Sequence, residues 1–285
     1  MKLLILSSTD QADSTKDFKT WAGKHKVSLR VIDPRSLSLQ IKKTAEVLFE
    51  KKPVEADLVL PRLGLLSFES GLRAALHFEA QGVKVVNSPS SIRQCSLKFE
   101  ALQTLASHGL PIPESYWPSE QETSQTTWNQ VKAKDLIQKL NQSSQGFGLG
   151  RTRSKEEFLS WRDFQRTTQA SAFVQKFATE TKGQDVRVFV CQGEILGAMV
   201  RTPAKGSYRS NLHQGGKISK AKLSVKEIDI TLQATQIFGL QYAGVDLLRT
   251  RNGVKILEVN PAPGWQGLKK LYRLDVVEEL LQPYC

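Results

Sequence analysis

The chain has 285 residues, 40% of them hydrophobic, which is enough for a large core and for two or three domains. Forty Lys and Arg against 28 Asp and Glu give a formal net charge of +12, so the surface should attract polyanions such as nucleotides, nucleic acid or acidic peptides. Cys95, Cys191 and Cys285 have no metal-site spacing, which argues against a zinc site or a disulfide framework. No window is apolar enough for a signal peptide or a membrane span, so we expect a soluble cytoplasmic protein without membrane partners.

The first third of the chain alternates short apolar segments with helical ones. Strands are predicted at 2–7, 27–33, 56–64 and 83–87, and helices at about 12–25 and 68–82. Because strands separated by helices are typical of βαβ units, we expect an α/β domain with a parallel sheet. The amphipathic segment 91–110 begins with Ser91 and carries Gly109 near its end, which predicts one continuous helix.

The rest of the chain has a different pattern. Residues 114–134 are polar and rich in Thr, Gln and Ser, so we predict a loop or an irregular edge there. A strand at 135–140, a glycine-bearing stretch and a helix at about 155–168 follow. The later apolar segments, at 171–177, 185–202 and 243–260, predict antiparallel strands joined by tight turns. The expected fold class is therefore α/β followed by α+β.

Two neighbouring apolar segments near the C-terminus carry three polar residues where a core strand should be apolar. They are Asp246 in AGVDLL and Glu258 and Asn260 in ILEVN. Burying an unpaired carboxylate is costly, so a cation is expected nearby. Two carboxylates and an amide oxygen suit Mg²⁺, which completes its shell with water and phosphate oxygens. The alternative is an exposed antiparallel edge with ordinary polar residues.

The turn between these two segments decides whether the polar residues meet. A two-residue turn at 252–253 would place Asp246 opposite Val259 and send the other two residues to the opposite face. A three-residue loop at 251–253, with its glycine in the left-handed conformation, would place Asp246 opposite Glu258 instead. The metal-site interpretation requires the second arrangement.

The stretch QSSQGFGLG at 142–150 lacks the spacing of a P-loop and of a dinucleotide fingerprint. Its small residues, including Gly146 and Gly148, would let backbone N–H groups close over phosphates as a lid and exclude water. A plain hairpin turn is the alternative. Lys139 favours the phosphate interpretation, because it places a cation in an otherwise strand-like segment just before the loop.

A second polar loop, YRSNLHQGG at 208–216, offers donors for an anion. Arg209 presents a fork of N–H groups for a phosphate or carboxylate, and Ser210 and Asn211 add neutral hydrogen-bonding groups. His213 is less informative, because a histidine in a polar loop is more often solvated than catalytic.

In order and spacing these motifs resemble the ATP-grasp superfamily, and specifically the RimK-like ligases that add glutamate to the C-terminus of a small-subunit ribosomal protein. The resemblance spans nearly the whole chain, through PRLG (61–64), the segment 85–115, KLNQSSQGFG (139–148), VQKF (174–177), GQDVR (183–187), YRSNLHQGG, AGVDLL and LEVNPAPG. It implies an N-terminal parallel-sheet domain at 1–95, a small lobe with a Gly-rich lid at 96–170, and a catalytic lobe at 171–285. The two lobes would clasp ATP.

The resemblance also implies roles for individual residues. Nucleotide contacts correspond to Lys98, Lys139, Gly146, Gly148, Lys176, Phe177, Asp185, Arg209, Ser210 and Asn211, with Arg209 and Asn211 also catalytic. Two Mg²⁺ ions, for which Mn²⁺ can substitute, would be held by Asp246, Glu258 and Asn260. One departure is Lys176, where the family usually has Glu at the adenine-contacting hinge; backbone groups there can still meet adenine.

The activity that the resemblance implies is ATP-dependent amide bond formation. A substrate carboxylate takes the γ-phosphoryl group, giving ADP and an acylphosphate, and an amine then displaces phosphate. The expected amine is glutamate and the expected acceptor is the C-terminal carboxylate of a protein or peptide, with a ribosomal protein as one candidate. Two alternatives remain open: a small-molecule or carrier-protein acceptor, and a non-catalytic nucleotide-regulated binding protein. We also expect a homo-oligomer, and nucleic-acid binding stays open.

Overall fold

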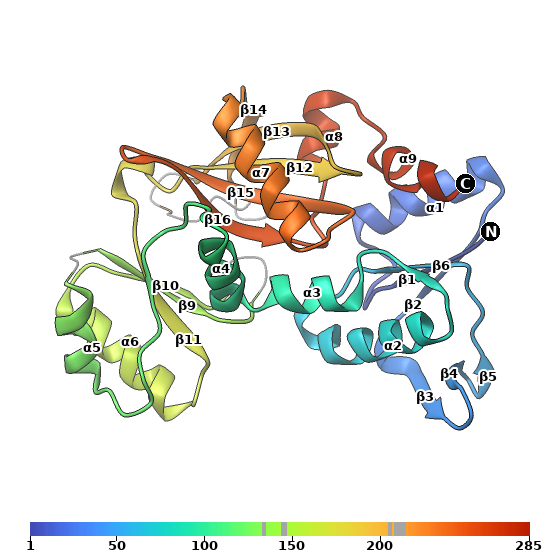
Figure 1. The fold of residues 1–285 in the computed structure, drawn as a ribbon, viewed down its shortest axis with the longest axis horizontal. Coiled ribbons are helices and arrows are strands. Elements are labelled where there is room, and N and C mark those ends of the chain that lie inside the picture. The colour runs from blue at the N-terminus through green and yellow to red at the C-terminus, as the bar shows by residue number, and fades with distance from the viewer. Residues whose placement is uncertain (133–134, 144–146, 205–206, 208–214) are drawn as a thin grey trace.

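The computed structural model describes residues 1–132, 135–143, 147–204, 207 and 215–285. Figure 1 shows three parts: the N-terminal elements in blue and cyan, a green to yellow-green lobe, and a C-terminal sheet in yellow and orange followed by red helices. These parts agree with the predicted α/β and α+β fold class. The division after residues 95 and 170 stays a prediction. No helix in the described ranges is long and apolar enough to cross a membrane.

The N-terminal part contains the predicted parallel sheet, in the strand order β2-β1-β6-β7. Its strands are β1 (Lys2–Leu6), β2 (Ser28–Ile32), β6 (Leu58–Pro61) and β7 (Lys84–Val85), with helices α1 (Asp13–His25) and α2 (Phe68–Ala80). This part also contains a small antiparallel sheet that was not predicted, formed by β3 (Leu37–Ile41), β4 (Ala45–Phe49) and β5 (Lys52–Pro53). Short 3₁₀ turns lie at Pro34–Ser36 and Leu65–Ser67.

The single helix predicted at 91–110 is wrong, because the structure has two helices there. They are α3 (Pro89–Ser96) and α4 (Lys98–Ser107), separated by Leu97 in an extended conformation. The first two N–H groups of α4, those of Lys98 and Phe99, donate to the main-chain oxygen and the Oδ1 of Asn141, at 3.0 and 2.9 Å. A residue at the end of a distant strand therefore caps α4 and fixes the direction of Lys98.

The small lobe is a four-stranded antiparallel sheet in the order β10-β9-β11-β8. Its strands are β8 (Ser115–Tyr116), β9 (Leu136–Leu140), β10 (Leu149–Thr152) and β11 (Ala172–Lys176), with helices α5 (Ser124–Val131) and α6 (Lys155–Thr167). The prediction of a loop or an irregular edge at 114–134 is wrong for α5, whereas the two-residue strand β8 does lie at the edge of this sheet. Trp128 of α5 packs against Phe158 of α6, which gives this polar helix a buried contact.

The C-terminal sheet is antiparallel, in the order β14-β13-β12-β15-β16. Its strands are β12 (Asp185–Cys191), β13 (Glu194–Thr202), β14 (Lys217–Lys220), β15 (Tyr242–Thr250) and β16 (Gly253–Asn260). Helix α7 (Val225–Ile237) packs on it, and α8 (Gln266–Tyr272) and α9 (Val276–Leu281) follow β16, with 3₁₀ turns at Thr179–Thr181 and Gln282–Tyr284.

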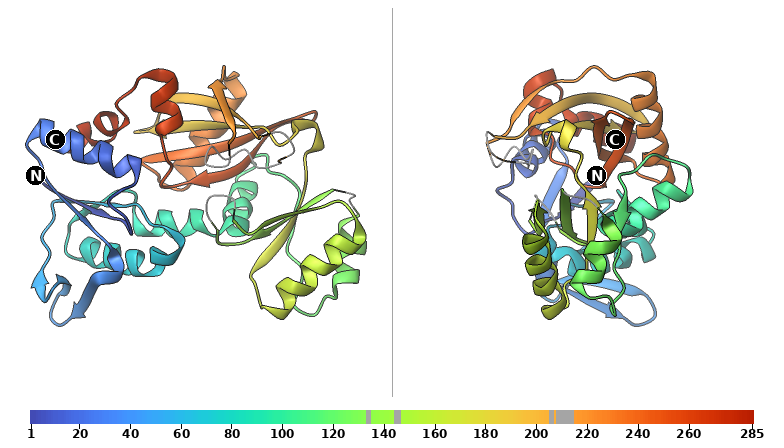
Figure 2. Two further views of the ribbon diagram at one scale, coloured as in Figure 1. Left: turned by 180° about the vertical axis from the view of Figure 1, so that it is seen from behind. Right: turned by 90° about the vertical axis from the view of Figure 1, so that its left-hand side faces the viewer.

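One buried cluster joins the N-terminal part to this sheet. Phe18 of α1 meets Trp265 edge-on, with ring centroids 5.4 Å apart, and Figure 2 shows α8 and α9 beside α1. The fully buried Asn87 donates to the main-chain oxygens of Tyr242 and Pro261 at 2.8 and 2.7 Å. Arg62 donates to the oxygen of Pro263 at 3.0 Å. These contacts fix the segment that follows Asn260.

Candidate active site

The paired strands β15 and β16 bring the predicted metal ligands together. Asp246 lies opposite Glu258, but the predicted three-residue loop is wrong. Thr250 pairs with Gly253, which leaves a two-residue turn, and the register shifts farther along the hairpin where Leu257 has no partner on β15. A β-bulge therefore produces the arrangement, because one extra residue on one strand changes which residues face each other.

Asp246 is buried and surrounded by arginines. Both of its oxygens accept from Arg187, at 2.7 Å each, and Oδ2 also accepts from Nη2 of Arg201 at 2.6 Å. Burial alone would raise the pKa of Asp246, but Arg187 and Arg201 outweigh burial and lower it to about 2. Arg201 also pairs with Asp185, at 2.6 and 2.8 Å. The side chains of Asp185 and Arg201 are each 6% exposed.

Glu258 has a more open environment. Its side chain is 36% exposed, and Oε1 accepts from Nζ of Lys98 at 2.9 Å. Burial raises the pKa of Glu258 and Lys98 lowers it, with a net decrease, so the carboxylate is charged at neutral pH. Two residues farther along the same strand, Asn260 uses Oδ1 to accept from the N–H of Ala262 at 2.9 Å. Alternation along a strand places Glu258 and Asn260 on one face.

Lys139 of β9 is a buried cation with a neutral partner. Its Nζ donates to Oε1 of Gln175 at 2.6 Å, and within the described part of the chain no carboxylate pairs with it. Burial lowers the pKa of Lys139 to about 8, although Glu258 acts in the opposite direction. An anionic ligand would stabilise the charged form of this lysine, which is the behaviour expected of a phosphate-binding group.

The two predicted hinge residues have different surroundings. Lys176 is exposed, with Nζ 3.8 Å from a carboxylate oxygen of Glu114, a contact of little energetic value at the surface. The ring of Phe177 faces the guanidinium of Arg151 at 3.8 Å, and Arg151 in turn pairs with Asp135. The Phe177 side chain is therefore held by contacts with neighbouring side chains, whereas the Lys176 side chain is largely exposed to solvent.

Gly148 has a local structural reason for being glycine. Its φ is +69°, and a Cβ there would lie 2.5 Å from the Leu140 side chain. Its carbonyl accepts from the N–H of Leu140, which closes the turn between β9 and β10. The other predicted loop residues, Gly146, Arg209, Ser210, Asn211 and the less informative His213, lie outside the described residues.

The donor set around β15 and β16 fits a magnesium–nucleotide complex. Figure 1 shows α4 between the C-terminal sheet and the small-lobe sheet, so Lys98 lies beside the strand that carries Glu258. In the described ranges no three His, Cys, Asp or Glu side chains group as a metal site. A bound Mg²⁺ would therefore complete its shell with the amide oxygen of Asn260, water and phosphate oxygens.

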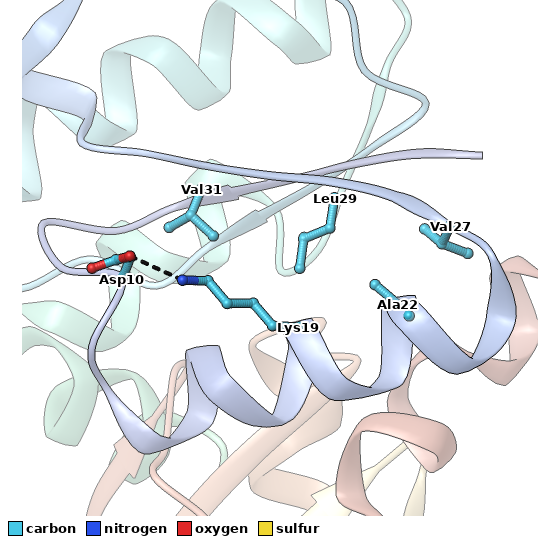
Figure 3. Close-up of a pocket in the computed structure, with 7 residues that line it drawn as sticks. Asp10, Lys19, Ala22, Val27, Leu29 and Val31 are labelled. Atoms are coloured by element: carbon cyan, nitrogen blue, oxygen red, sulfur yellow. Dashed lines mark hydrogen bonds and ion pairs between the residues drawn. The ribbon is translucent and has the colours of Figure 1, made fainter.

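A hollow of about 410 Å³ lies away from these residues, between α1 and β2 (Figure 3). Apolar side chains, Val27, Leu29 and Val31 among them, line one wall, and the ion pair between Lys19 and Asp10 lies at one end. Because its one lysine is already paired at 2.9 Å, this hollow is a poor phosphate site.

Comparison with known protein families assigns the chain to one of them. The RimK pre-ATP-grasp domain matches residues 1–92, and the RimK-like ATP-grasp domain matches residues 95–283. The chain belongs to the RimK-like ATP-grasp family. It is therefore an ATP-grasp carboxylate–amine ligase, an enzyme that forms a C–N bond.

One relative and two solved structures illustrate how far the similarity extends. A probable alpha-L-glutamate ligase of Haemophilus influenzae is 31% identical over 291 residues, covering 99% of this chain and 96% of the relative. A RimK domain ATP-grasp protein of Sphaerobacter thermophilus has a TM-score of 0.74 at 14% identity, covering 99% and 98%. The ATP-grasp ligase PsnB, complexed with a precursor variant, Mg and ADP, has a TM-score of 0.73 at 18% identity, covering 98% and 96%. The two structures share the fold.

The RimK-like ligase has two further charged residues at the site that sequence analysis missed. Arg187 and Arg201 both contact Asp246. Strand alternation signals the first, because Arg187 is two residues from Asp185 and must share its face. No comparable signal marks Arg201, whose role depends on how β13 and β15 flank β12.

Proposed function

We propose that this RimK-like ligase adds glutamate to the C-terminal carboxylate of a protein or peptide, releasing ADP and phosphate. The observation that carries the proposal is the facing pair of Asp246 and Glu258, with Lys98 and two arginines in contact with them. Such a set of oxygen ligands and cations suits a reaction that joins two anions, a carboxylate and a triphosphate.

The reaction has two steps. An acceptor carboxylate oxygen attacks the γ-phosphorus while the bond to the ADP oxygen breaks, which gives an acylphosphate. The glutamate nitrogen then attacks the acyl carbon, the C–O bond to phosphate breaks, and the nitrogen loses a proton. Lys98 and Lys139 would reduce the repulsion between the reacting anions, and Arg209 would stabilise the oxyanion of the second step.

The proposed metal ligands are Asp246, Glu258 and Asn260, for two Mg²⁺ ions or Mn²⁺ in their place. When bound there, the metal would supply positive charge that offsets the charge of the nucleotide phosphates. The chain's own contribution is to hold two carboxylates opposite each other by the bulge at Leu257.

Three observations support glutamate and a polypeptide acceptor. The Haemophilus relative is named a glutamate ligase, and PsnB binds a precursor. In this chain, residues 195–226 contain seven Lys and Arg and no Asp or Glu, and β14 from this stretch lies at the sheet edge beside Arg201. A cationic edge beside the site suits an acidic polypeptide. A ribosomal protein stays one candidate acceptor.

The test compares matched acceptor peptides with a free or an amidated C-terminus, each with ATP, Mg²⁺ and glutamate. We expect ADP release and a mass gain of one glutamate residue only with the free terminus, and a hydroxamate on the acceptor when hydroxylamine is added. AMP as the product would contradict phosphoryl transfer. Equal turnover of the amidated peptide, or turnover only with small carboxylates, would contradict the polypeptide C-terminus as acceptor.

A further inference from the structure

The two proposed metal-binding carboxylates are not equally available. Glu258 is 36% exposed and accepts from Lys98 through Oε1 only, among its described contacts. Asp246 accepts three hydrogen bonds from two guanidinium groups, and its side chain is 4% exposed. A carboxylate has about four lone-pair positions, so most of those on Asp246 are already used by arginine N–H groups. A metal ion and these arginines therefore compete for the same oxygens.

The two arginines differ in how firmly they are held. Arg201 is 6% exposed and makes a bidentate contact with Asp185 as well as its contact with Asp246. Arg187 is 14% exposed, and its described ion pair is the one with Asp246. Losing Asp246 would leave Arg201 anchored by Asp185, whereas Arg187 would keep only the electrostatic attraction of Glu258, with which no described hydrogen bond or ion pair connects it. Arg187 is therefore the group that can leave.

Gly244, two residues before Asp246 on β15, lets the Arg187 guanidinium lie close to this strand, because a Cβ at that position would lie 2.9 Å from the Pro263 side chain and 3.5 Å from Nε of Arg187. A released guanidinium would need a new anion, because an uncompensated charge in a partly buried position is unfavourable. Its planar fork of donors matches a phosphate group.

We propose that in the nucleotide-free enzyme Arg187 occupies the metal-binding oxygens of Asp246, and that the metal takes this place only when nucleotide phosphates accept Arg187. This inference rests on the proposed role of Asp246 as a metal ligand. Arg201 keeps Asp246 in position throughout, through its anchor on Asp185. The enzyme consequently binds free divalent metal weakly and takes it up together with the nucleotide.

The test measures Mn²⁺ binding by electron paramagnetic resonance, with and without ADP, on the full chain. Without ADP, we expect Arg187→Met to bind Mn²⁺ about ten- to a hundredfold more tightly than the wild type, because a competing positive charge is gone. Arg187→Lys, which keeps the charge, should show a smaller gain and serves if the Met variant does not fold. Adding Asp246→Asn to Arg187→Met should abolish the gain.

Arg249→Met is the matched control. Arg249 also pairs with a buried carboxylate of the C-terminal part, that of Glu227, at 2.6 Å, but away from Asp246. Its substitution should leave Mn²⁺ binding unchanged. If Arg187→Met and Arg187→Lys both bind free Mn²⁺ no better than the wild type, the inference is wrong.

The same titrations separate this failure from failure of the metal assignment. If Asp246→Asn still loses Mn²⁺ binding in the presence of ADP, Asp246 is a ligand and only the role of Arg187 is overturned. If Asp246→Asn binds Mn²⁺ with ADP as well as the wild type does, the metal assignment fails and the inference fails with it.

Discussion

The two sheets that face the candidate site hold their charges in opposite ways. In the C-terminal sheet, Asp185, Asp246 and the two arginines neutralise one another within 3 Å. In the small lobe, Lys139 is buried against the neutral Gln175. The buried charges of the C-terminal sheet are therefore paired before any ligand binds. The small lobe instead carries a buried cation whose charge only an anionic ligand would neutralise. Nucleotide binding should therefore depend on the small lobe, and metal chemistry on the C-terminal sheet.

The largest expected effect is on turnover. Glu258→Gln and Asp246→Asn should lower Mg-dependent ADP release by about a thousandfold or more, because phosphoryl transfer relies on charge neutralisation at fixed positions. The measurement is ADP release at saturating ATP, with circular dichroism to check folding. Glu227→Gln, which changes a carboxylate of α7 that pairs with Arg249, is the control and should keep the activity. Near-normal turnover in Glu258→Gln would refute its assignment as a metal ligand.

Removing a buried cation should change the free energy of unfolding in opposite directions in the two sheets. Arg201→Met removes one partner from two buried carboxylates, so we expect the free energy of unfolding to fall by about 3–5 kcal/mol. Lys139→Met replaces a buried cation that lacks a carboxylate partner in the described ranges, so the free energy of unfolding should rise by about 1–3 kcal/mol. Urea denaturation without nucleotide measures both. The comparison would fail if the two variants changed stability in the same direction.

Nucleotide affinity should depend on pH through Lys139. Its folded-state pKa is about 8, against an ordinary value of 10.5, so the unfolded chain binds the proton more tightly. The free energy of unfolding should consequently rise between about pH 8 and 10.5, while the affinity for ATP falls as the lysine loses its charge. Lys139→Arg, which stays protonated, is the control and should have a flatter ATP affinity profile. A wild-type profile equally flat from pH 7 to 9.5 would argue against a phosphate contact.

The smallest expected effect concerns the acceptor. Raising salt from about 50 to 300 mM shortens the Debye length from roughly 14 to 6 Å, so affinity for an acidic acceptor peptide should fall severalfold. Lys217→Ser with Lys222→Ser, in the acid-free stretch, should reduce this salt dependence, whereas Lys42→Ser with Lys43→Ser in the N-terminal part should not. Titration of a labelled acceptor peptide at each salt concentration measures this affinity. Salt-independent affinity would leave the basic stretch without a role in acceptor binding.

Local pattern alone determined much of this protein. The parallel sheet follows from alternating apolar and helical segments, and its four strands lie where the sequence places them. Asp246 and Glu258 are conspicuous because a charged residue in an apolar strand requires a partner. The motifs in order and spacing also indicated the family, which the domain matches confirm.

Tertiary structure decided the features that local pattern does not encode. The amphipathic segment 91–110 looks like one helix, yet Asn141 from another strand supplies the cap that starts a second one at Lys98. The turn at 251–252 by itself would separate Asp246 from Glu258, and only the bulge at Leu257 restores their pairing. Arg201 meets two aspartates because β12 lies between its own strand and β15. Caps, bulges and buried ion pairs depend on groups distant in sequence, so periodicity within one segment carries no information about them.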